Sequence, residues 1–442
     1  MRSREEKDKM YAEKQEKYLS LLHDETSLAL GCTEPGAVAL AAAYAAAVLE
    51  EEVQKIKIIV SSYILKNGMN VGIPGTGMSG FSIAAAMGSI GKNPEKGLMV
   101  LNGISDIEIQ KAKEMVKKNI ISIDLAETEE KVYVEAQVTS KNHYARAVIK
   151  ENHQNLVLLE RDRKKIFERK AEELYEKNSQ KNLENYDMTL KEIVNFVKSV
   201  PEEELKFLEQ ILQTNQAIAR EGMRGNYGLK VGYSMLHGQK TGLIGGDIAT
   251  YASAMAAAAA DARMSGCELP VVSTAGSGNQ GITATVPIIE IGEKLGIKQD
   301  KIRRAAALSI LFTIHTKQYL GRLSVLCGCS IAAAMGVGCG IIFMKDGTYE
   351  QMCHTVSTMV ADISGVVCDG AKPGCALKIA TAVESAVRAA NMALNGKGAG
   401  GQDGIVCEDV EATLSNLGIL GNIGMKNTNR MILKMMLQKQ KI

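Results

Sequence analysis

The chain has 442 residues, a formal net charge of +2, 46% hydrophobic residues, 42 glycines and no tryptophan. This length predicts two or three domains with an ample core. The near-neutral charge and the aromatic content of only 4% argue against nucleic acid as the main partner, because few side chains could stack on bases.

The N-terminal segment MRSREEKDKMYAEKQEKY is charged throughout and contains no apolar stretch typical of a secretory signal. We therefore expect a cytoplasmic protein, in which thiols stay reduced. The nine cysteines are then free, catalytic or metal-bound rather than paired in disulfides.

Residues 11–30 have a helical pattern, which the segment GCTEPG breaks before the pattern resumes over 37–52. Thr33 suits an N-cap and Pro35 suits a first turn, so Cys32 lies just ahead of a helix start. Seen alone, Cys32 could equally be a small buried residue at a turn. We assign residues 1–54 to a helical domain that continues in the C-terminal half.

A compact α+β domain is predicted over residues 55–160. Its strand-like segments and one amphipathic helix are residues 55–65, 107–118 (the helix), 120–125, 132–138, 144–149 and 156–159. The glycines from Gly72 to Gly80 suit an anion-binding turn or a plain one. The charge-dense residues 161–204 predict an exposed helical connector.

Residues 205–442 are helical in pattern almost throughout. The predicted fold class is therefore α+β, with a predominantly helical catalytic domain and a smaller α+β domain inserted near the N-terminus. Within the helical part, the segment STAGSGNQG ends a buried extended stretch and starts a helix. Its hydroxyls, amides and backbone N–H groups suit a bound carboxylate. The candidate donors are Ser273, Ser277, Asn279 and Gln280.

The same loop contains the spacing G-x-G-x-x-G, but no alternating strand–helix–strand unit surrounds it. We therefore do not predict a nucleotide site there. A tight turn between packed helices is the alternative.

The uncharged run LSVLCGCSIAAAMGVGCGIIFM at 323–344 is long enough to span a bilayer. It is rich in small residues and stands alone in a chain whose mean hydropathy is -0.04. We therefore expect a helix buried in the protein core rather than a membrane segment.

Three loops present cysteines near helix starts, where the positive end of the helix dipole favours a thiolate. They carry Cys32, the pair Cys327 and Cys329, and the pair Cys368 and Cys375. No cysteine or histidine spacing typical of zinc is present. Thiolates gathered from distant segments suit iron–sulfur chemistry. For Cys267, Cys353 and Cys407 we expect core packing.

Four motifs along the chain together resemble the L-cysteine desulfidase family, relatives of the iron–sulfur L-serine dehydratase α chain. They are GCTEPGAVALA at 31–41, STAGSGNQG at 273–281, LCGCSIAAA at 326–334 and CDGAKPGCALK at 368–378. The resemblance implies a 4Fe-4S cluster held by three cysteines with one iron open, and no pyridoxal phosphate.

Carried over by resemblance, Cys32 and Cys368 are two cluster ligands, and the third is Cys327 or Cys329. The helix start SIAAA aligns Cys329 with a serine dehydratase ligand, whereas the Cys-Gly at Cys327 resembles the desulfidases, and we favour Cys327. Gln280 stands where the serine dehydratases carry another cluster cysteine, so the cluster is not held in quite their way, and Cys368 is a candidate replacement.

The implied reaction is β-elimination of L-cysteine with water to pyruvate, ammonia and hydrogen sulfide, the open iron binding the leaving group. L-serine is the alternative substrate. A base must also reach the Cα proton. His315 and Lys317 are our catalytic candidates, with His237 and Lys372 also in suitable loops, and each of the four is more often a bystander.

Two other function classes stay open. A non-catalytic iron–sulfur sensor would need the cysteines without the STAGSGNQG donors, and a pyridoxal-dependent lyase would need one essential lysine and no cluster. The expected partner is a small amino-acid substrate, without nucleic acid or membrane, and a homo-oligomer is compatible with the sequence.

Overall fold

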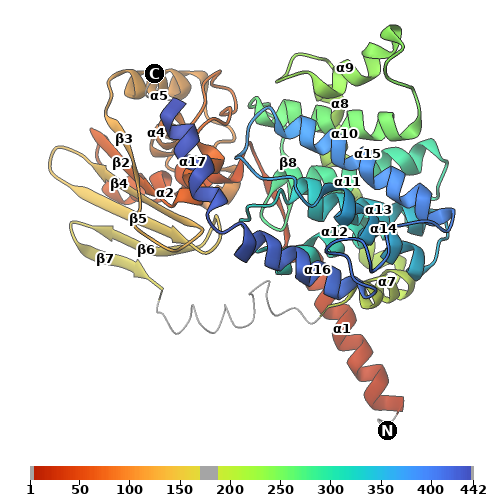
Figure 1. Cartoon of the computed structure of the whole chain (residues 1–442). Coiled ribbons are helices and arrows are strands. Elements are labelled where there is room, and N and C mark those ends of the chain that lie inside the picture. The colour runs from red at the N-terminus through yellow and green to blue at the C-terminus, as the bar shows by residue number, and fades with distance from the viewer. Residues whose placement is uncertain (1–3, 170–187, 440–442) are drawn as a thin grey trace.

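Two lobes, one α+β and one helical, make up the computed structural model, which describes residues 4–169 and 188–439 (Figure 1). The expected α+β fold class is confirmed. The α+β lobe is built on a six-stranded mixed sheet with the order β3-β2-β4-β5-β6-β7. Its strands are β2 (Lys55–Val60), β3 (Ile121–Leu125), β4 (Tyr133–Thr139), β5 (Tyr144–Lys150), β6 (Leu156–Arg161) and β7 (Lys164–Glu168).

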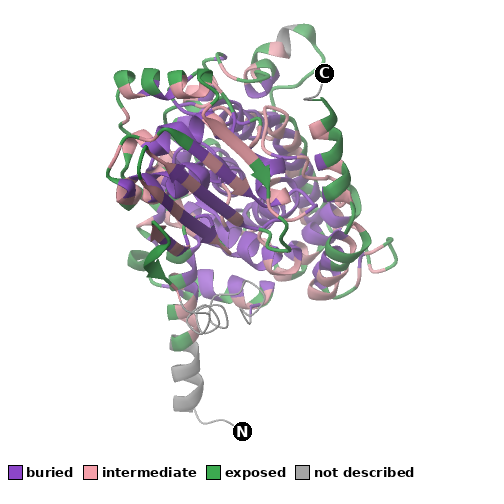
Figure 2. Ribbon diagram, turned by 90° about the vertical axis from the view of Figure 1, so that its left-hand side faces the viewer, coloured by how far each residue is buried: buried purple, intermediate pink, exposed green. Residues whose placement is uncertain are grey.

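Helices cover one face of this sheet. They are α2 (Thr33–Leu49), α3 (Ser62–Gly68), α4 (Phe81–Gly91), η1 (Pro94–Met99) and α5 (Asp106–Lys117), joined by the C-terminal α17 (Thr428–Gln438). Alternate strand residues such as Ile56, Ile58 and Val60 are fully buried against them. Figure 2 shows these buried residues along the strands, with exposed residues gathered on the lobe's rim.

The helical lobe places long helices around a core rich in alanine. They are α1 (Arg4–Asp24), α7 (Leu190–Ser199), α8 (Leu208–Gly222), α9 (Val231–His237), α10 (Ile248–Met264), α11 (Gly278–Lys294), α12 (Gln299–Leu320), α13 (Ala334–Met344), α14 (Tyr349–Ile363), α15 (Cys375–Leu394) and α16 (Val410–Ile419). Short turns lie between them: η3 (Glu202–Leu205), η4 (Gly238–Thr241), η5 (Cys329–Ala333) and η6 (Leu420–Gly424).

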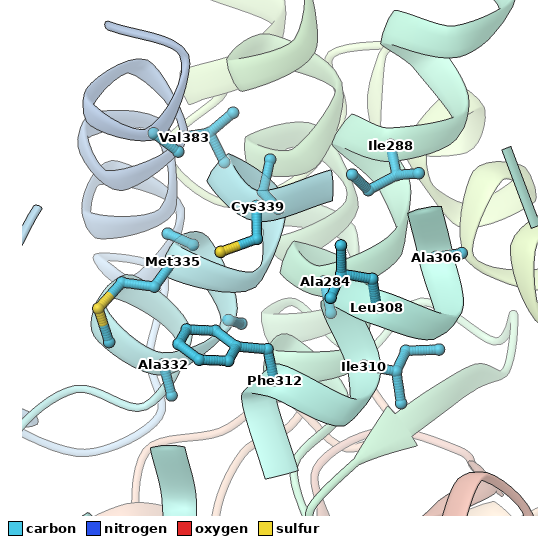
Figure 3. Packing of buried hydrophobic residues seen from close by; sticks show 14 of the residues in the cluster. Ala284, Ile288, Ala306, Leu308, Ile310, Phe312, Ala332, Met335, Cys339 and Val383 are labelled. Atoms are coloured by element: carbon cyan, nitrogen blue, oxygen red, sulfur yellow. The ribbon is translucent and has the colours of Figure 1, made fainter. Parts of the chain in front are cut away.

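Small residues let these helices approach closely. A Cβ on Gly222 would lie 1.9 Å from the carbonyl oxygen of Ala258, and one on Gly232 would lie 2.1 Å from that of Ala254. Figure 3 shows Cys339 inside this core beside apolar side chains of neighbouring helices. The run at 323–344 is therefore part of the helical core, and no helix in the described ranges is both long and apolar enough to cross a membrane.

The structure differs from the sequence prediction at the first lobe boundary. We expected residues 1–54 to belong to the helical part, yet α2 packs on α4 and on the sheet within the α+β core. Its side chains are apolar on nearly every face, so the pattern does not show which neighbour they meet. The helix begins at Thr33, and Cys32 rather than Thr33 occupies the N-cap position.

Two further segments differ for identifiable reasons. The strand expected over 55–65 ends at Val60, because the Ser61 hydroxyl accepts a hydrogen bond from the backbone of Ile64 and starts α3. The helical pattern over 11–30 ends at Asp24, and β1 (Thr26–Ala29) pairs antiparallel with β8 (Val271–Thr274). Pairing with a strand so distant in sequence leaves no local signal.

The expected exposed helical connector over 161–204 is not what the described part of that segment shows. Its beginning forms the end of β6 and the exposed edge strand β7. Its end forms α7, which buries Leu190, Ile193 and Val197 in the helical core. Residues 170–187 lie outside the described residues.

Candidate active site

The two cysteine segments of the helical lobe lie side by side. Leu326 and Val367 form an isolated antiparallel bridge. The backbone N–H of Cys327 donates to Val366 at 2.9 Å, and that of Cys368 donates to Val325 at 2.6 Å. Residues 41 positions apart in sequence are thereby fixed next to each other by backbone hydrogen bonds.

The loop after Cys368 is also tied to the α+β lobe. The Lys66 ammonium donates to the carbonyl of Cys368 at 2.9 Å, and the backbone N–H of Ala371 donates to Asn67 at 3.0 Å. At Gly370, φ is +97° and a Cβ would lie 2.2 Å from the Lys66 carbonyl oxygen, so only glycine fits. The lobes therefore meet at this loop.

Cys32 reaches the same place from the start of α2. Its thiol is buried and donates to the Glu34 carboxylate at 3.0 Å. Glu34 also accepts from the Asn67 side chain at 2.9 Å. Cys32 packs in one small apolar group with Val71, Met264 and Cys375. Three segments far apart in sequence therefore bring thiols to one region between the lobes.

Cys327 and Cys329 interact with each other through their thiols. The Cys329 thiol donates to the Cys327 sulfur, which also accepts from the Ser330 hydroxyl at 3.3 Å. These hydrogen bonds lower the pKa of Cys327 to about 6 despite its burial. The hydrogen bond to Cys327 and burial raise the pKa of Cys329, and the nearby charges of Cys327, Cys375 and Cys368 raise it further. Cys327 is thus the thiol of this pair that ionises first.

A buried cation accompanies these thiols. Lys317 is 1% exposed, forms no ion pair with a carboxylate in the described part of the chain, and donates to the Ser324 hydroxyl at 3.2 Å. Burial lowers its pKa to about 8, while the charges of Cys368, Cys329 and Cys327 oppose that shift. A buried ammonium without a carboxylate requires other negative charge nearby. Thiolates would supply it.

The donor set consists of cysteine thiols, which are the usual ligands of an iron–sulfur cluster. Among the described residues, no three His, Cys, Asp or Glu side chains are gathered closely enough to hold one ion. A cluster is wider than an ion and is held by thiolates alone. Buried or half-buried cysteines from three loops, with the buried ammonium groups of Lys66 and Lys317 beside them, match that requirement.

A second feature of the site, centred on Arg263, has the chemistry that suits an anion. Arg263, at the end of α10, is 2% exposed and donates to the Gly31 carbonyl at 3.0 Å and to the Asn279 side chain at 2.9 Å. Its Nη2 is buried without a hydrogen-bond partner. A Cβ on Gly278 would lie 2.6 Å from the guanidinium carbon, so this group lies at the N-terminus of α11. Free backbone N–H groups and a guanidinium together suit a carboxylate.

Arg263 is a residue that sequence reasoning missed. In the sequence it is an arginine in the last turn of an Ala-rich helix, which is the ordinary place for a cation. Its burial, and the two loops it joins, depend on folding. The one available signal was an Arg close before the STAGSGNQG segment.

The predicted substrate-binding residues divide into two groups. Asn279 and Gln280 are buried at the start of α11, where Asn279 holds Arg263. Gln280 donates to the carbonyls of Thr274 and Ala275. Ser277 is the N-cap residue of α11 and makes no side-chain capping bond. Ser273 instead bonds Ser27 across the β1–β8 pair, so its hydroxyl serves that pairing.

The predicted base candidates also separate. Lys317 lies with the cysteines, whereas the Nε2 of His315 lies 2.6 Å from the Glu411 carboxylate, toward α16. His237 is exposed and bonds the Tyr233 carbonyl, and Lys372 forms an ion pair with Asp369 at 2.9 Å.

With this geometry in hand, the chain can be compared with known proteins. The model of the family described as "Serine dehydratase alpha chain" matches residues 95–434. The chain belongs to this family. The expected relationship to the serine dehydratase α chain is thereby confirmed, and the family is one of iron–sulfur β-elimination lyases.

Close relatives cover almost the whole chain. A UPF0597 protein of Oleidesulfovibrio alaskensis is 42% identical over 424 residues, covering 96% of this chain and 98% of the relative. A UPF0597 protein of Clostridium perfringens is 39% identical, with 96% and 99% covered, and one of Aeromonas salmonicida is 38% identical, with 96% and 96% covered. Both lobes are therefore shared with these relatives.

Proposed function

We propose that this protein is an iron–sulfur-dependent lyase that converts L-cysteine and water to pyruvate, ammonia and hydrogen sulfide. One observation carries the proposal: thiols from three segments meet between the lobes, next to a buried Arg263 whose Nη2 has no partner in the described residues. A thiolate site beside a carboxylate site is what elimination from an amino acid requires.

Cys32, Cys327 and Cys368 would hold the 4Fe-4S cluster. We choose Cys327 over Cys329 because its sulfur accepts the hydrogen bonds of the pair and is the readier thiolate. When bound, a cluster with one open iron supplies a Lewis acid for the departing β-substituent. The Lys317 ammonium would offset the negative charge that the thiolates bring into the site.

The start of α11 would hold the substrate carboxylate. The free Nη2 of Arg263 and the backbone N–H groups of the first turn are fixed donors, since Asn279 and the Gly31 carbonyl anchor the guanidinium. Such fixed donors stabilise the negative charge that develops on the substrate when the Cα proton is removed. Glu34, buried close by, is suited to receive the substrate ammonium. Although burial alone would raise the pKa of Glu34, interaction with His153 in its protonated form and the hydrogen bonds from Cys32 and Asn67 hold it below its usual range.

L-serine is the second candidate substrate, favoured by the description of the family itself. The same residues would bind its carboxylate and ammonium, and water would leave in place of sulfide. The two substrates differ only in the leaving atom.

The test is a product assay on protein purified and reconstituted with iron and sulfide without oxygen. L-cysteine should give sulfide and pyruvate in equal amounts, with activity lost in air. Pyruvate release from L-serine but not from L-cysteine would show that the enzyme is a serine dehydratase instead. Turnover of neither substrate by cluster-loaded protein would contradict the lyase proposal and leave an iron–sulfur sensor.

The matched pair of variants is Cys32→Ala and Cys339→Ala. Both remove a buried thiol, but Cys339 is surrounded by apolar side chains of the helical core (Figure 3). Only Cys32→Ala should lose iron and activity. Equal loss in both would show a general effect of removing buried thiols.

A further inference from the structure

The turn between β5 and β6 sends one histidine into the molecule. Asn152 and Gln154 in this turn are exposed, whereas His153 between them is only 4% exposed. The backbone of the turn is closed by hydrogen bonds from Lys150 to the Asn155 carbonyl at 3.1 Å and from Asn155 to Asn152 at 3.3 Å. A polar turn thus holds a buried imidazole in a fixed position.

The ring of His153 lies among groups of the proposed site. Its electrostatic neighbours are Glu34 of α2 and Arg322, which follows α12. Arg322 bonds Glu25 at 2.6 Å and also lies beside the start of α11, since a Cβ on Gly276 would be 3.1 Å from its Nη1. His153 therefore lies within electrostatic range of Glu34 and of Arg322, and Arg322 borders the loop that precedes α11.

The imidazole is available for a ligand. Its Nε2 is buried and has no hydrogen-bond partner in the part of the chain that the structure describes. Burial lowers the pKa of His153, the Glu34 charge opposes this, and the Arg322 charge adds to it, which favours the neutral ring. A neutral imidazole with a free nitrogen can accept a proton.

The other histidines are differently placed. Nε2 of His315 is taken by Glu411 of α16, and its Nδ1 is buried without a partner in the described residues. His237 and His143 lie at the surface with other partners, and His23 stacks on Phe207. His354 lies against Gly398.

We propose that His153 is the base that removes the Cα proton of the amino-acid substrate, and that the α+β lobe thereby completes the active site. This inference rests on the proposed function. In the step, the Cα–H proton passes to Nε2 of His153, and the electron pair of that bond forms the Cα=Cβ double bond. The Cβ–S bond breaks, and the sulfur leaves with its electron pair as hydrosulfide.

The remaining steps complete the reaction and regenerate the enzyme. The aminoacrylate product tautomerises to an imine, which water hydrolyses to pyruvate and ammonia. His153 gives its proton back to solvent or to a product, so the enzyme is unchanged. No oxidant or reductant is consumed.

The experiment uses full-length protein with ¹⁵N-labelled histidine, whose six imidazoles are few enough to resolve by NMR. The probe is L-alanine, which carries the carboxylate, ammonium and Cα–H of the substrate but no leaving group. His153→Asn assigns the resonance, and His143→Asn, in the turn between β4 and β5 at the other end of β5, is the control. We expect L-alanine to shift the His153 imidazole signals and to leave those of His143 in place.

In the loaded enzyme, His153→Asn should lower kcat at least about 100-fold, as for loss of a general base. Its iron content and its affinity for L-alanine should stay within about threefold of wild type. His153→Gln serves as the second variant if the first folds poorly.

Three results would overturn the base role: an unshifted His153 signal at saturating L-alanine, near-normal kcat in the variant, or loss of iron or L-alanine binding in step with kcat. The last would mark a structural residue. If wild-type protein releases no product from either substrate, the proposed function fails and the base role fails with it, whereas an active wild type with an unshifted His153 signal removes the base role alone.

Discussion

Gln280 and Gly328 are in such close contact that a Cβ on Gly328 would lie 1.9 Å from Oε1 of Gln280. The glutamine is 2% exposed, and its Nε2 donates to the carbonyls of Thr274 and Ala275, so it cannot turn away. Gly328 separates Cys327 from Cys329. Gln280 thus buttresses the turn that presents these two thiols.

The first prediction follows from this contact. Gly328→Ala should push the turn away from Gln280, displace the two thiols and weaken iron binding by roughly 10- to 100-fold, the usual effect of disturbing groups that position metal ligands. Iron and acid-labile sulfide per chain after reconstitution measure it. Gly365→Ala is the control, because nothing lies within 4 Å of a Cβ there. Normal iron content in Gly328→Ala would show that the contact does not position the thiols.

The second prediction concerns Arg263. Arg263→Lys keeps the charge but cannot hold Gly31, Asn279 and a carboxylate at once, so KM should rise about 10- to 100-fold, the value of one or two charged hydrogen bonds. Arg304→Lys is the matched control, since Arg304 also joins a side chain to backbone carbonyls but lies near Val197 and Val200. Steady-state kinetics with each substrate decides. An unchanged KM in Arg263→Lys would place the substrate carboxylate elsewhere.

The third prediction concerns pH and stability. Asp261 is 1% exposed and accepts backbone hydrogen bonds from Leu229 and Gly232, and burial raises its pKa to about 6. Between the usual aspartate pKa of about 3.9 and about 6, the folded state keeps a proton on Asp261 that the unfolded state has released. The contribution of Asp261 to stability is therefore full below about pH 3.9 and is lost as the pH rises through about 6.

Asp261→Asn should remove this slope. Urea unfolding between pH 4 and 7 should show wild type losing on the order of 2 kcal/mol relative to the variant. Parallel stability curves for the two proteins would mean that Asp261 does not titrate in this range.

The fourth prediction concerns the C-terminal helix. α17 leaves the helical lobe and packs on α3, which carries Lys66 and Asn67 to the Cys368 loop. Leu433 is its buried apolar residue, at 4% exposure, and Leu433→Ala should cost about 2–5 kcal/mol of unfolding free energy. Met431→Ala, at a position 58% exposed, should cost under about 0.5 kcal/mol. Chemical denaturation compares them, and equal costs would show that α17 is not docked in solution.

Sequence reasoning predicted the strands with short-range patterns. The sequence pattern of each of four strands, β3, β4, β5 and β6, lies within one short segment. The predicted bounds of these strands agree with the observed ones within a residue or two. β1 could not be found from a local pattern, because its partner β8 lies about 245 residues later in the sequence, after the whole α+β lobe. β7 is charged and exposed, so it carries no apolar signal.

The thiol segments were identified from cysteines at helix starts, and the structure brings Cys32, Cys327, Cys368 and Cys375 into one region. Arg263 and His153 were not found. Each looks ordinary in sequence, one in a last helical turn and one in a polar turn. Only the packing of the two lobes buries them and leaves Nη2 and Nε2 without partners.

The most direct test of the account is lyase rate against cluster content in one preparation. Metal-free protein is reconstituted anaerobically with increasing iron and sulfide, and pyruvate release from L-cysteine is measured at each loading. The account predicts no activity without the cluster and a rate proportional to bound cluster, with sulfide equal to pyruvate. Activity in metal-free protein, or fully loaded protein that releases pyruvate from neither L-cysteine nor L-serine, would contradict it.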